Sequence, residues 1–246
     1  MEKAVQLKEN AIKHHKKQYI KSLKMKTIAI VGAGTGLGLS IAKKFGKNGF
    51  QVALIARNQQ KLNDLVAELK QSGIEASAFT ADILDKAQII SAFNAVKEKY
   101  GFIDVLEYSP VPSVQNLAGT LDVNEENALH QFQFNVLGAI SSINEVLPAM
   151  LKKNTGALLF TTGGASIHPT PMMGNVGIAM AGLRNHVLNL NTELSGKGIY
   201  AGHIGIGVWM QEGSGVQDTI AEIWYDMYTR RDRAEEYISE DTVRSL

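Results

Sequence analysis

Apolar and polar positions along the chain alternate between two patterns. Short, mostly apolar runs are typical of buried parallel strands, and longer stretches between them repeat their apolar residues at helical spacing. The predicted strands are Ile28–Val31, Gln51–Ala56, Glu75–Ala81, Ile103–Tyr108, Ala157–Thr162 and Ile199–Ile206. The predicted helices start after a glycine-rich turn at 32–38, after the capping residues Asn58 and Asp85, and at 124–150, 175–194 and 216–231. We expect the helix at 124–150 to bend or end near Pro148.

This alternation predicts one α/β domain over residues 25–246, a Rossmann-like doubly wound parallel sheet with helices on both faces. No proline- or serine-rich linker and no internal repeat divides the sequence. Ligands of such sheets bind outside the carboxyl ends of the strands, so this edge is where we expect a functional site.

The turn after the first predicted strand carries glycine at every second position, Gly32, Gly34, Gly36 and Gly38. Such a turn has few side chains, so its backbone N–H groups and the following helix N-terminus are open to an anion, most naturally a pyrophosphate. A strand before the glycines and a helix after them favour a nucleotide site. The alternative is a tight strand-to-helix turn that needs glycine for packing.

Composition narrows the function classes. The chain of 246 residues is 45% hydrophobic, carries a net charge of +1 and has no cysteine. Disulfides and thiolate chemistry are excluded, which fits a cytoplasmic location. The low net charge gives no case for nucleic acid as a partner, and we expect neither a membrane span nor a metal site.

Residues 1–24 differ from the rest in charge. They contain seven lysines against two glutamates. We predict a solvated, partly helical extension, with Met25 as a plausible alternative start. A basic amphipathic helix that touches a membrane or RNA is the alternative, with Ile12, Tyr19, Ile20 and Leu23 on its apolar side.

The spacing of the glycines selects a family. The common dinucleotide fingerprint requires a glycine where Leu37 or Leu39 stands, whereas Gly32, Gly36 and Gly38 fit the spacing G-x-x-x-G-x-G. This spacing resembles the short-chain dehydrogenase/reductase family, and the resemblance covers most of residues 26–210. It implies a dinucleotide cofactor held by Gly32, Thr35, Gly36, Leu37 and Gly38.

Two further positions bear on the cofactor. At the end of the second strand, where an acidic residue would hold the ribose hydroxyls of NADH, the chain has Ala56 followed by Arg57. By resemblance, an arginine here favours NADP over NAD, because its guanidinium can hold the 2′-phosphate; an exposed arginine after a strand is also ordinary. Asp82 and Ile83 match the family pair beside the adenine, although a capping or turn aspartate is the alternative.

The resemblance weakens after the fourth strand and at the catalytic positions. The chain reads E-Y-S-P-V-P at 107–112, where the family usually has N-N-A-G. The family uses an Asn, a Ser, and a Tyr followed four residues later by Lys as its acid/base machinery. Asn135 matches the Asn, whereas Gly163, Val176 and Met180 stand at the other three positions in the family register. Asn135 without its lysine partner can also simply tie the long helix to the sheet.

Other residues are candidate substitutes for the missing Ser, Tyr and Lys. His168 is one candidate, since histidine is a common acid/base residue, and the hydroxyl groups of Tyr108, Thr161, Thr162 and Ser166 are others. Each is more often a loop or packing residue. Met172, Met173 and Trp209 are either an apolar substrate wall or core residues, and we expect His203 to be a buried, hydrogen-bonded histidine.

The C-terminal stretch Ala221–Glu236 mixes aromatic and charged residues. We predict a packed helix with an outer face of ion pairs, or alternatively a lid or a partner contact. The family's usual seventh strand is not visible here. By resemblance, we expect a homo-oligomer formed through the helices around 125–150 and 175–195.

Three functional hypotheses follow. The first is an atypical NADP-dependent oxidoreductase that acts on a small-molecule substrate, with its proton supplied by water or by a residue outside the family set. The second is a catalytically inactive dinucleotide-binding protein, either a redox sensor or a partner subunit. The third is a structural domain with an empty site.

Overall fold

A seven-stranded sheet in the order β3-β2-β1-β4-β5-β6-β7 organises the chain. The computed structural model describes residues 25–211 and 214–244, so the expectations for residues 1–24 lie outside the described residues. Every neighbouring pair of strands is parallel. The strands are β1 (Lys26–Val31), β2 (Phe50–Ala56), β3 (Ala76–Thr80), β4 (Val105–Tyr108), β5 (Gly156–Gly163), β6 (Ile199–Ile206) and β7 (Glu235–Ile238). The predicted doubly wound parallel sheet is confirmed.

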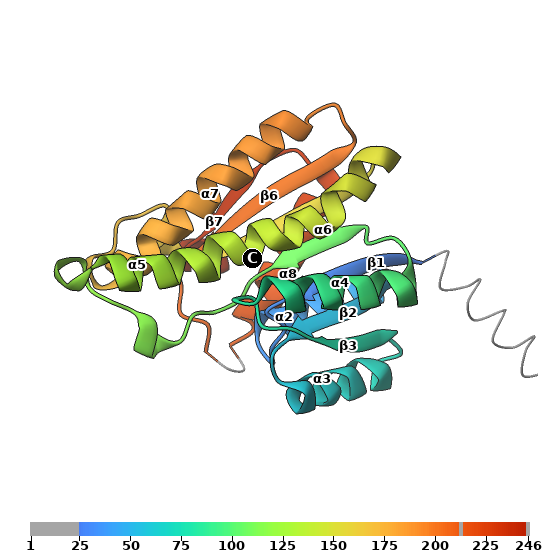
Figure 1. Cartoon of the computed structure of the whole chain (residues 1–246). Coiled ribbons are helices and arrows are strands. Elements are labelled where there is room, and N and C mark those ends of the chain that lie inside the picture. The colour runs from blue at the N-terminus through green and yellow to red at the C-terminus, as the bar shows by residue number, and fades with distance from the viewer. Residues whose placement is uncertain (1–24, 212–213, 245–246) are drawn as a thin grey trace, which may run out of the picture.

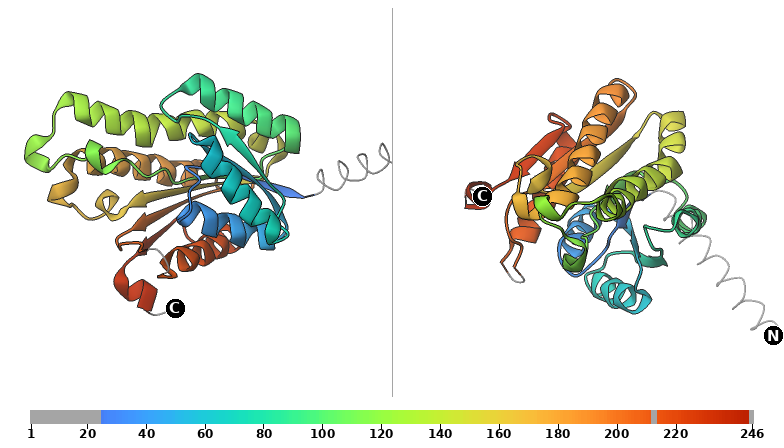
Figure 2. Two further views of the ribbon diagram at one scale, coloured as in Figure 1. Left: turned by 90° about the horizontal axis from the view of Figure 1, so that it is seen from below. Right: turned by 60° about the vertical axis from the view of Figure 1, so that its left-hand side comes forward.

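Helices cover both faces of this sheet (Figures 1 and 2). One face packs against α2 (Leu37–Lys47), α3 (Gln59–Gln71) and α8 (Val216–Arg230). The other face packs against α4 (Lys86–Tyr100), α6 (Gly138–Lys153) and α7 (Gly174–Leu194), and α5 (Glu125–Phe132) runs into α6. The short helical pieces are η1 (Val114–Asn116), η2 (Thr120–Asp122), η3 (Gln133–Leu137), η4 (Gly164–Ser166), η5 (Pro171–Met173) and α9 (Glu240–Arg244).

The central strands are apolar on both sides because both sides are buried. In β1, Ile28 and Ile30 belong to the core under α2 and α8, while Ala29 and Val31 belong to the core under α4, α6 and α7. The first winding places β2 and β3 on one side of β1, and the second places β4 to β7 on the other. The order in which strands are added to the sheet therefore reverses between β1 and β4. The carboxyl ends of these two strands border the crevice where such folds bind ligands.

Both predicted helix caps are present. The Asn58 side chain accepts a hydrogen bond from the Lys61 N–H at 3.0 Å and begins α3. The Asp85 carboxylate accepts from the Ala87 and Gln88 N–H groups at 2.9 and 3.2 Å and begins α4. Such bonds satisfy donors that lack a partner inside the helix, which is why these residue types mark helix starts in the sequence.

The long helix predicted from Asn124 does not end at Pro148. That proline lies inside α6, which continues to Lys153. The irregularity falls earlier, at η3, a π-helical turn between α5 and α6. A π-turn absorbs an extra residue without breaking the helix, so it re-aims the first half of the helix relative to the second.

The C-terminal prediction was wrong in two respects. The helix ends at Arg230, and Arg231 follows in the left-handed conformation with φ 52°. Residues 235–238 then form the seventh strand that the sequence did not reveal. β7 lies at the edge of the sheet and three of its four residues are half-buried, so it lacks the apolar run that identified the other strands.

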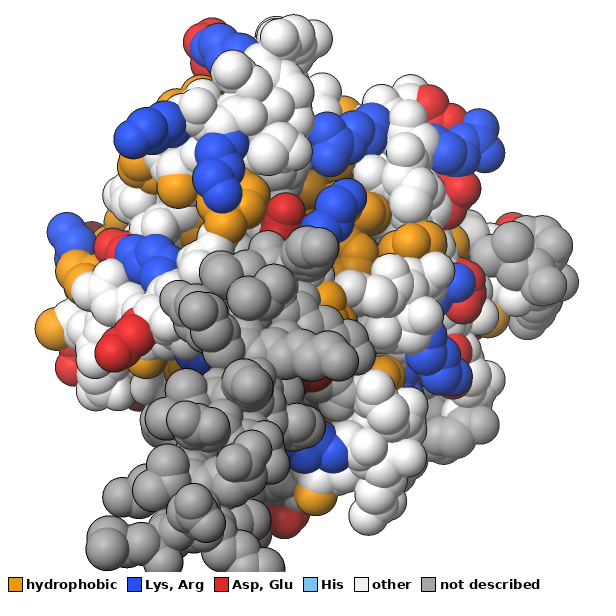
Figure 3. All heavy atoms as spheres, turned by 90° about the vertical axis from the view of Figure 1, so that its right-hand side faces the viewer, with side chains coloured by type: hydrophobic (Ala, Val, Ile, Leu, Met, Phe, Trp, Pro, Cys, Tyr) orange, Lys and Arg blue, Asp and Glu red, His pale blue; other side chains and the backbone are white. Residues whose placement is uncertain are grey.

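The side of the molecule where β1 begins has a mixed surface. On this side, Figure 3 shows lysine and arginine side chains interspersed with acidic and hydrophobic ones. Among the described residues, one continuous helical segment, Glu125–Lys153, is long and apolar enough to cross a membrane, and half of its most apolar window is buried inside the fold. A core helix of a globular protein has the same properties, so this segment does not amount to a clear membrane span.

Candidate cofactor and active site

The glycine turn joins β1 to α2 at the carboxyl edge of the sheet. Gly32 adopts φ +90°, a conformation that favours glycine. A Cβ atom at this position would lie 2.6 Å from the backbone of Pro110, which leads the loop after β4. The Gly32 and Ala33 N–H groups both donate to the Ile55 carbonyl, at 2.9 and 3.2 Å. Gly32 is therefore fixed by packing, as the alternative interpretation of the turn required.

The middle of the turn is open. Within the described part of the chain, no heavy atom lies within 4 Å of a Cβ built on Gly34 or Gly36, and Thr35 and Gly36 are exposed. α2 begins at Leu37 and has Gly36 as its N-cap. The first N–H groups of a helix have no acceptor inside it, and the helix dipole makes this end positive. The turn therefore offers an anion uncovered backbone donors, which packing alone does not explain.

Leu37 and Gly38 enter the core rather than the open space. The Leu37 side chain is 8% exposed, and a Cβ on Gly38 would lie 3.1 Å from the Ala33 Cα atom. Only the backbone N–H groups of these two residues can therefore face a ligand at the start of α2. The glycine at 38 allows the helix to begin close to β1.

Arg57 and Asp82 follow β2 and β3, the strands next to β1 on one side. The glycine turn, Arg57 and Asp82 thus stand on three successive strands at the same edge of the sheet. Arg57 is exposed. The Asp82 carboxylate accepts from the Leu84 N–H at 3.0 Å, as a turn aspartate does, and Ile83 is 9% exposed and faces the core.

The loop after β4 starts from buried polar groups. Burial raises the pKa of Glu107 to about 8, and this carboxyl group accepts hydrogen bonds from Ser109 at 3.0 Å and Thr161 at 3.3 Å. Tyr108 points into the opposite core, where burial raises its pKa and its hydroxyl donates to the Phe134 carbonyl at 2.6 Å. Tyr108 is therefore a structural residue and not an acid facing the site.

Asn135 lies in η3 and is 4% exposed. Its amide donates to the carbonyl and side-chain oxygens of Gln131, at 3.0 and 3.1 Å. Gln131 in turn donates to the Asn116 carbonyl at 2.8 Å. Asn135 therefore bonds within its own helical segment, and Gln131 ties that segment to the loop after β4 rather than to the sheet.

The three residues that the resemblance places at the other catalytic positions, Gly163, Val176 and Met180, meet at the junction of β5 and α7. Gly163 ends β5, and its N–H donates to the Met180 sulfur at 3.3 Å. Val176 and Met180 are on α7 and are 2% and 8% exposed. Asn175, beside Val176, accepts from the Ala118 N–H at 2.9 Å and donates to the Asn116 carbonyl at 2.9 Å, so the loop after β4 lies over the start of α7. Gly163, Val176 and Met180 carry no group that can transfer a proton at neutral pH.

The remaining sequence candidates lie on β5 and in the segments that follow β5 and β6. The exposed His168 ring lies 4.6 Å from the Tyr237 ring in an edge-to-face contact. Met172 and Trp209 are 70% and 83% exposed, so they are not core residues, while Met173 is half-buried. Thr161 accepts from the buried Trp224 indole at 3.0 Å.

A hydrogen-bonded cluster beside Gly163 was only partly predicted. His203 is buried, as expected, with its Nε2 atom 2.8 Å from the Thr162 hydroxyl and its Nδ1 atom 2.9 Å from Glu235. Arg184 donates to both oxygens of Glu235, at 2.6 and 2.7 Å. No local pattern indicates this cluster, because its members come from β5, β6, β7 and α7, and β7 itself was not predicted.

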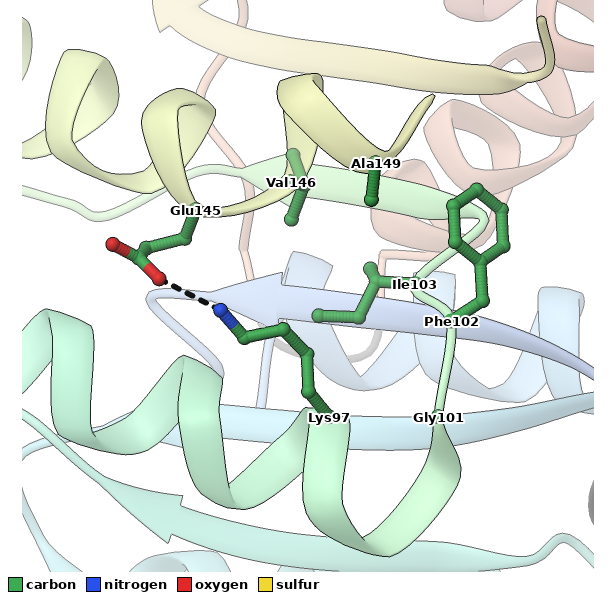
Figure 4. Close-up of a pocket in the computed structure, with 7 residues that line it drawn as sticks. All are labelled: Lys97, Gly101, Phe102, Ile103, Glu145, Val146 and Ala149. Atoms are coloured by element: carbon green, nitrogen blue, oxygen red, sulfur yellow. Dashed lines mark hydrogen bonds and ion pairs between the residues drawn. The ribbon is translucent and has the colours of Figure 1, made fainter. Parts of the chain in front are cut away.

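A small cavity elsewhere is not part of this site. It measures about 40 Å³ and lies between α4 and α6 near the start of β4, lined by Lys97, Gly101, Phe102, Ile103, Glu145, Val146 and Ala149 (Figure 4). Lys97 and Glu145 form an ion pair of 2.8 Å across it. Its volume is close to that of a single water molecule, so no cofactor fits there. Across residues 25–211 and 214–244, no group of three or more His, Asp or Glu side chains could hold a metal ion.

Comparisons with known proteins agree with this arrangement. A family model described as short chain dehydrogenase matches residues 26–212. A putative ketoacyl reductase from Streptomyces coelicolor is 29% identical over 237 residues, which cover 88% of this chain and 86% of that protein. An uncharacterized oxidoreductase from Staphylococcus epidermidis is 28% identical over 178 residues, 72% of this chain and 75% of that protein.

Solved structures share the fold. A short-chain dehydrogenase from Rhodopseudomonas palustris superposes with a TM-score of 0.77 at 24% identity and covers 87% of this chain and 98% of its own. An L-sorbose reductase from Gluconobacter frateurii, complexed with NADPH and L-sorbose, superposes with a TM-score of 0.80 at 16% identity, covering 91% and 98%.

Proposed function

Because the chain belongs to the short-chain dehydrogenase/reductase family, we propose that residues 25–246 form an NADP(H)-binding domain that acts as an atypical oxidoreductase on a small molecule. The observation that carries this proposal is the open turn at Gly34–Gly36, where backbone donors and the N-terminus of α2 are uncovered. The pyrophosphate is assigned to this turn, where the backbone of Thr35, Gly36, Leu37 and Gly38 would hold it.

The adenosine half is assigned to the edge formed by β1, β2 and β3. Asp82 would accept from the adenine amino group while Ile83 packs beside the ring. Arg57, exposed after β2, would hold a 2′-phosphate through charge-assisted hydrogen bonds. The reductase from Gluconobacter frateurii with NADPH and a metagenomic short-chain oxidoreductase with NADP show this cofactor class on the same fold. NADP is therefore favoured over NAD.

The nicotinamide half is assigned to the carboxyl ends of β4 and β5. When bound, the cofactor supplies or accepts a hydride at this end. Here the Gly163 N–H group contacts the Met180 sulfur, and Asn135 bonds to Gln131 within the helical segment that precedes α6. The protein would bring substrate and cofactor together by proximity, and the proton must come from a group other than a tyrosine at position 176.

A catalytically inactive dinucleotide-binding protein is the second candidate. It is favoured by one observation: the positions of the family's Ser, Tyr and Lys hold Gly163, Val176 and Met180, and two of these residues bond to each other instead of facing a substrate. Both candidates share the cofactor site, so turnover separates them.

Location and assembly are part of the same proposal. A cytoplasmic location is supported by the absence of cysteine from the sequence. A homo-oligomer is supported by exposed apolar side chains along α5, η3 and α7, namely Leu129, Phe132, Leu137 and Ile178. Because α5 and η3 both pack against α7, these exposed side chains lie on neighbouring helices, and large exposed apolar side chains that gather in this way are typical of an interface.

The cofactor preference is tested at Arg57. We expect Arg57→Ala to weaken NADPH binding by about tenfold or more and to change NADH binding little, because only NADPH carries the 2′-phosphate. Lys70→Ala, at the far end of α3, is the matched loss of a positive charge and should leave both affinities as in the wild type. Calorimetric titration of the wild type and the two variants with each cofactor measures the six affinities. If Arg57→Ala lowered the affinities for NADPH and NADH equally, Arg57 would not hold the 2′-phosphate.

A further inference from the structure

Four polar side chains form an unbroken hydrogen-bonded path across three strands. Ser166 Oγ lies 2.8 Å from Thr162 Oγ1, and Thr162 Oγ1 lies 2.8 Å from His203 Nε2. His203 Nδ1 lies 2.9 Å from Glu235 Oε1. We call Ser166, Thr162, His203 and Glu235 the His203 relay. Its first three members are 6%, 3% and 0% exposed, so water does not replace these bonds.

Charge fixes the direction of the bond between His203 and Glu235. Hydrogen bonds from Arg184 hold the pKa of Glu235 below its usual value, so this carboxylate is ionised and accepts from the His203 Nδ1–H group. Burial lowers the pKa of His203, the Arg184 charge acts in the same direction, and Glu235 opposes both. The neutral imidazole therefore has its lone pair at Nε2, 2.8 Å from the Thr162 hydroxyl, and this hydroxyl donates to Ser166 Oγ.

The Ser166 end of the relay lies where the family's machinery is missing. Thr162 directly precedes Gly163, whose N–H group contacts Met180. Ser166 ends η4, and η4 packs against α7 beside Gly177, where the Ala165 carbonyl would lie 3.6 Å from an added Cβ. Gly177 is the neighbour of Val176. The Ser166 hydroxyl thus borders the junction of β5 and α7, where a serine and a tyrosine would stand in the family.

We propose that the His203 relay replaces the missing tyrosine as the proton path of this oxidoreductase, with the Ser166 hydroxyl as the group that touches the substrate oxygen. This inference rests on the proposed function. In the direction of carbonyl reduction, protons run from His203 to Ser166, and the Thr162 hydroxyl already donates that way. In the direction of alcohol oxidation, both hydroxyl groups first turn, so that Ser166 donates to Thr162 and Thr162 donates to His203 Nε2. The substrate O–H bond then breaks and its proton passes to Ser166, the Ser166 proton passes to Thr162, and the Thr162 proton passes to His203 Nε2. The substrate C–H bond breaks as a hydride leaves for the oxidised nicotinamide.

The products balance the charge. One carbonyl compound, one reduced nicotinamide and one imidazolium are formed, and Glu235 stabilises the imidazolium across the 2.9 Å contact. Carbonyl reduction runs through the same steps in reverse and needs His203 protonated. Ser166 is the catalytic residue in this scheme, whereas Thr162, His203 and Glu235 act through it. The arrangement has the logic of a serine, histidine and carboxylate triad, recognised by geometry.

A purely structural role is the competing explanation, because the same bonds join β5, β6 and β7 to α7. The two roles differ in what the cofactor does to His203. A relay that ends beside the nicotinamide senses the positive charge of the oxidised ring, whereas a strut remote from the ring does not. The oxidised and reduced cofactors differ in charge at this ring, so they form a matched pair of probes.

The test is nuclear magnetic resonance of the His203 ring nitrogens in the full chain, titrated with pH in the presence of NADP⁺ or NADPH. We expect the His203 pKa to be lower in the NADP⁺ complex by about half a pH unit or more. Signals of His203 are assigned by their loss in His203→Gln. Cofactor binding with an identical His203 pKa in both complexes would overturn the relay and leave the proposed function standing. No binding of either cofactor would overturn the proposed function.

Variants test the Ser166 end with a panel of ketones and NADPH. Ser166→Ala should keep the NADPH affinity, lower the rate of hydride transfer by about a hundredfold and flatten its pH profile between about pH 5 and 8. Thr170→Ala removes a hydroxyl of the same loop that donates to the His168 carbonyl, and it should behave as the wild type. A wild-type pH profile in Ser166→Ala would contradict the proposal.

Discussion

Glu107 is a carboxyl group at the centre of the sheet, with no exposed surface. It faces α8, where Thr161 links it to the indole of Trp224. Burial raises its pKa from 4.5 to about 8, so the folded protein holds a proton that the unfolded chain releases above pH 4.5. Between these two values the unfolded state binds fewer protons than the folded state, and stability falls as pH rises.

We predict that Glu107→Gln removes this loss. The wild type should lose up to about 1.4 kcal/mol of unfolding free energy per pH unit through Glu107 between pH 4.5 and 8, whereas the amide is neutral throughout. The difference between the two proteins should therefore grow with pH in favour of the variant. Urea unfolding at several pH values measures it, and parallel stability curves for the two proteins would refute the assignment.

Single residues differ in how well the sequence predicts their roles. Asn58 and Asp85 were predicted as caps because a cap bonds to its own helix, within three residues. The buried state of His203 was predicted because it lies in an apolar strand. The partners of Glu107 and His203 were not, because Thr161 and Glu235 reach them from other strands. Such contacts depend on the register of the sheet, which a local pattern does not contain.

At the scale of elements, the four glycines of the turn between β1 and α2 serve two purposes, packing and access for a ligand. Gly32 and Gly38 permit close packing against Pro110 and Ala33, while Gly34 and Gly36 leave open space. The sequence showed that glycine was needed and not which glycines served which purpose. The structure separates the packing positions from the ligand-facing ones.

We predict that Gly32→Ala destabilises the protein by at least about 2 kcal/mol, since the new Cβ meets strain at φ +90° and backbone atoms of Pro110 at 2.6 Å. Gly49→Ala is the matched control, because Gly49 has φ +87° and, among the described residues, no heavy atom within 4 Å of an added Cβ. That control should cost only about 1 kcal/mol. Thermal unfolding measures both, and equal losses would show that the contact with Pro110 contributes nothing.

Elements were predictable where burial is two-sided and failed where it is not. The strands from β1 to β6 were located within two residues at each end, because buried parallel strands are apolar on both faces. β7 has one neighbour, and its glutamates bond to Arg184, His203 and Arg233. Two of these three partners, Arg184 and His203, are distant in sequence, so a local pattern does not reveal them. Pro148 misled the prediction in the opposite direction, since α6 tolerates it.

At the scale of the whole molecule, the carboxyl edge divides into two halves. Over β3, β2 and β1 the expected cofactor residues lie on neighbouring strands, so the resemblance and the geometry point to the same function. Over β4, β5 and β6, Gly163, Val176 and Met180 stand where the resemblance places the family's acid/base residues, and a different set of polar groups, centred on His203, occupies the interior. We therefore propose that the molecule combines a cofactor half of the family's kind with an altered catalytic half.

Binding of NADPH by the full chain tests this account most directly. We predict calorimetric binding of one NADPH per chain with Kd below about 1 mM. Thr35→Glu places a carboxylate in the open turn and should weaken binding at least about tenfold, whereas Thr35→Gln, of the same size without the charge, should stay within about threefold of the wild type. Thr35 is exposed, so neither variant disturbs the core. Absence of NADPH binding to the wild type, or equal affinity of the two variants, would contradict the account.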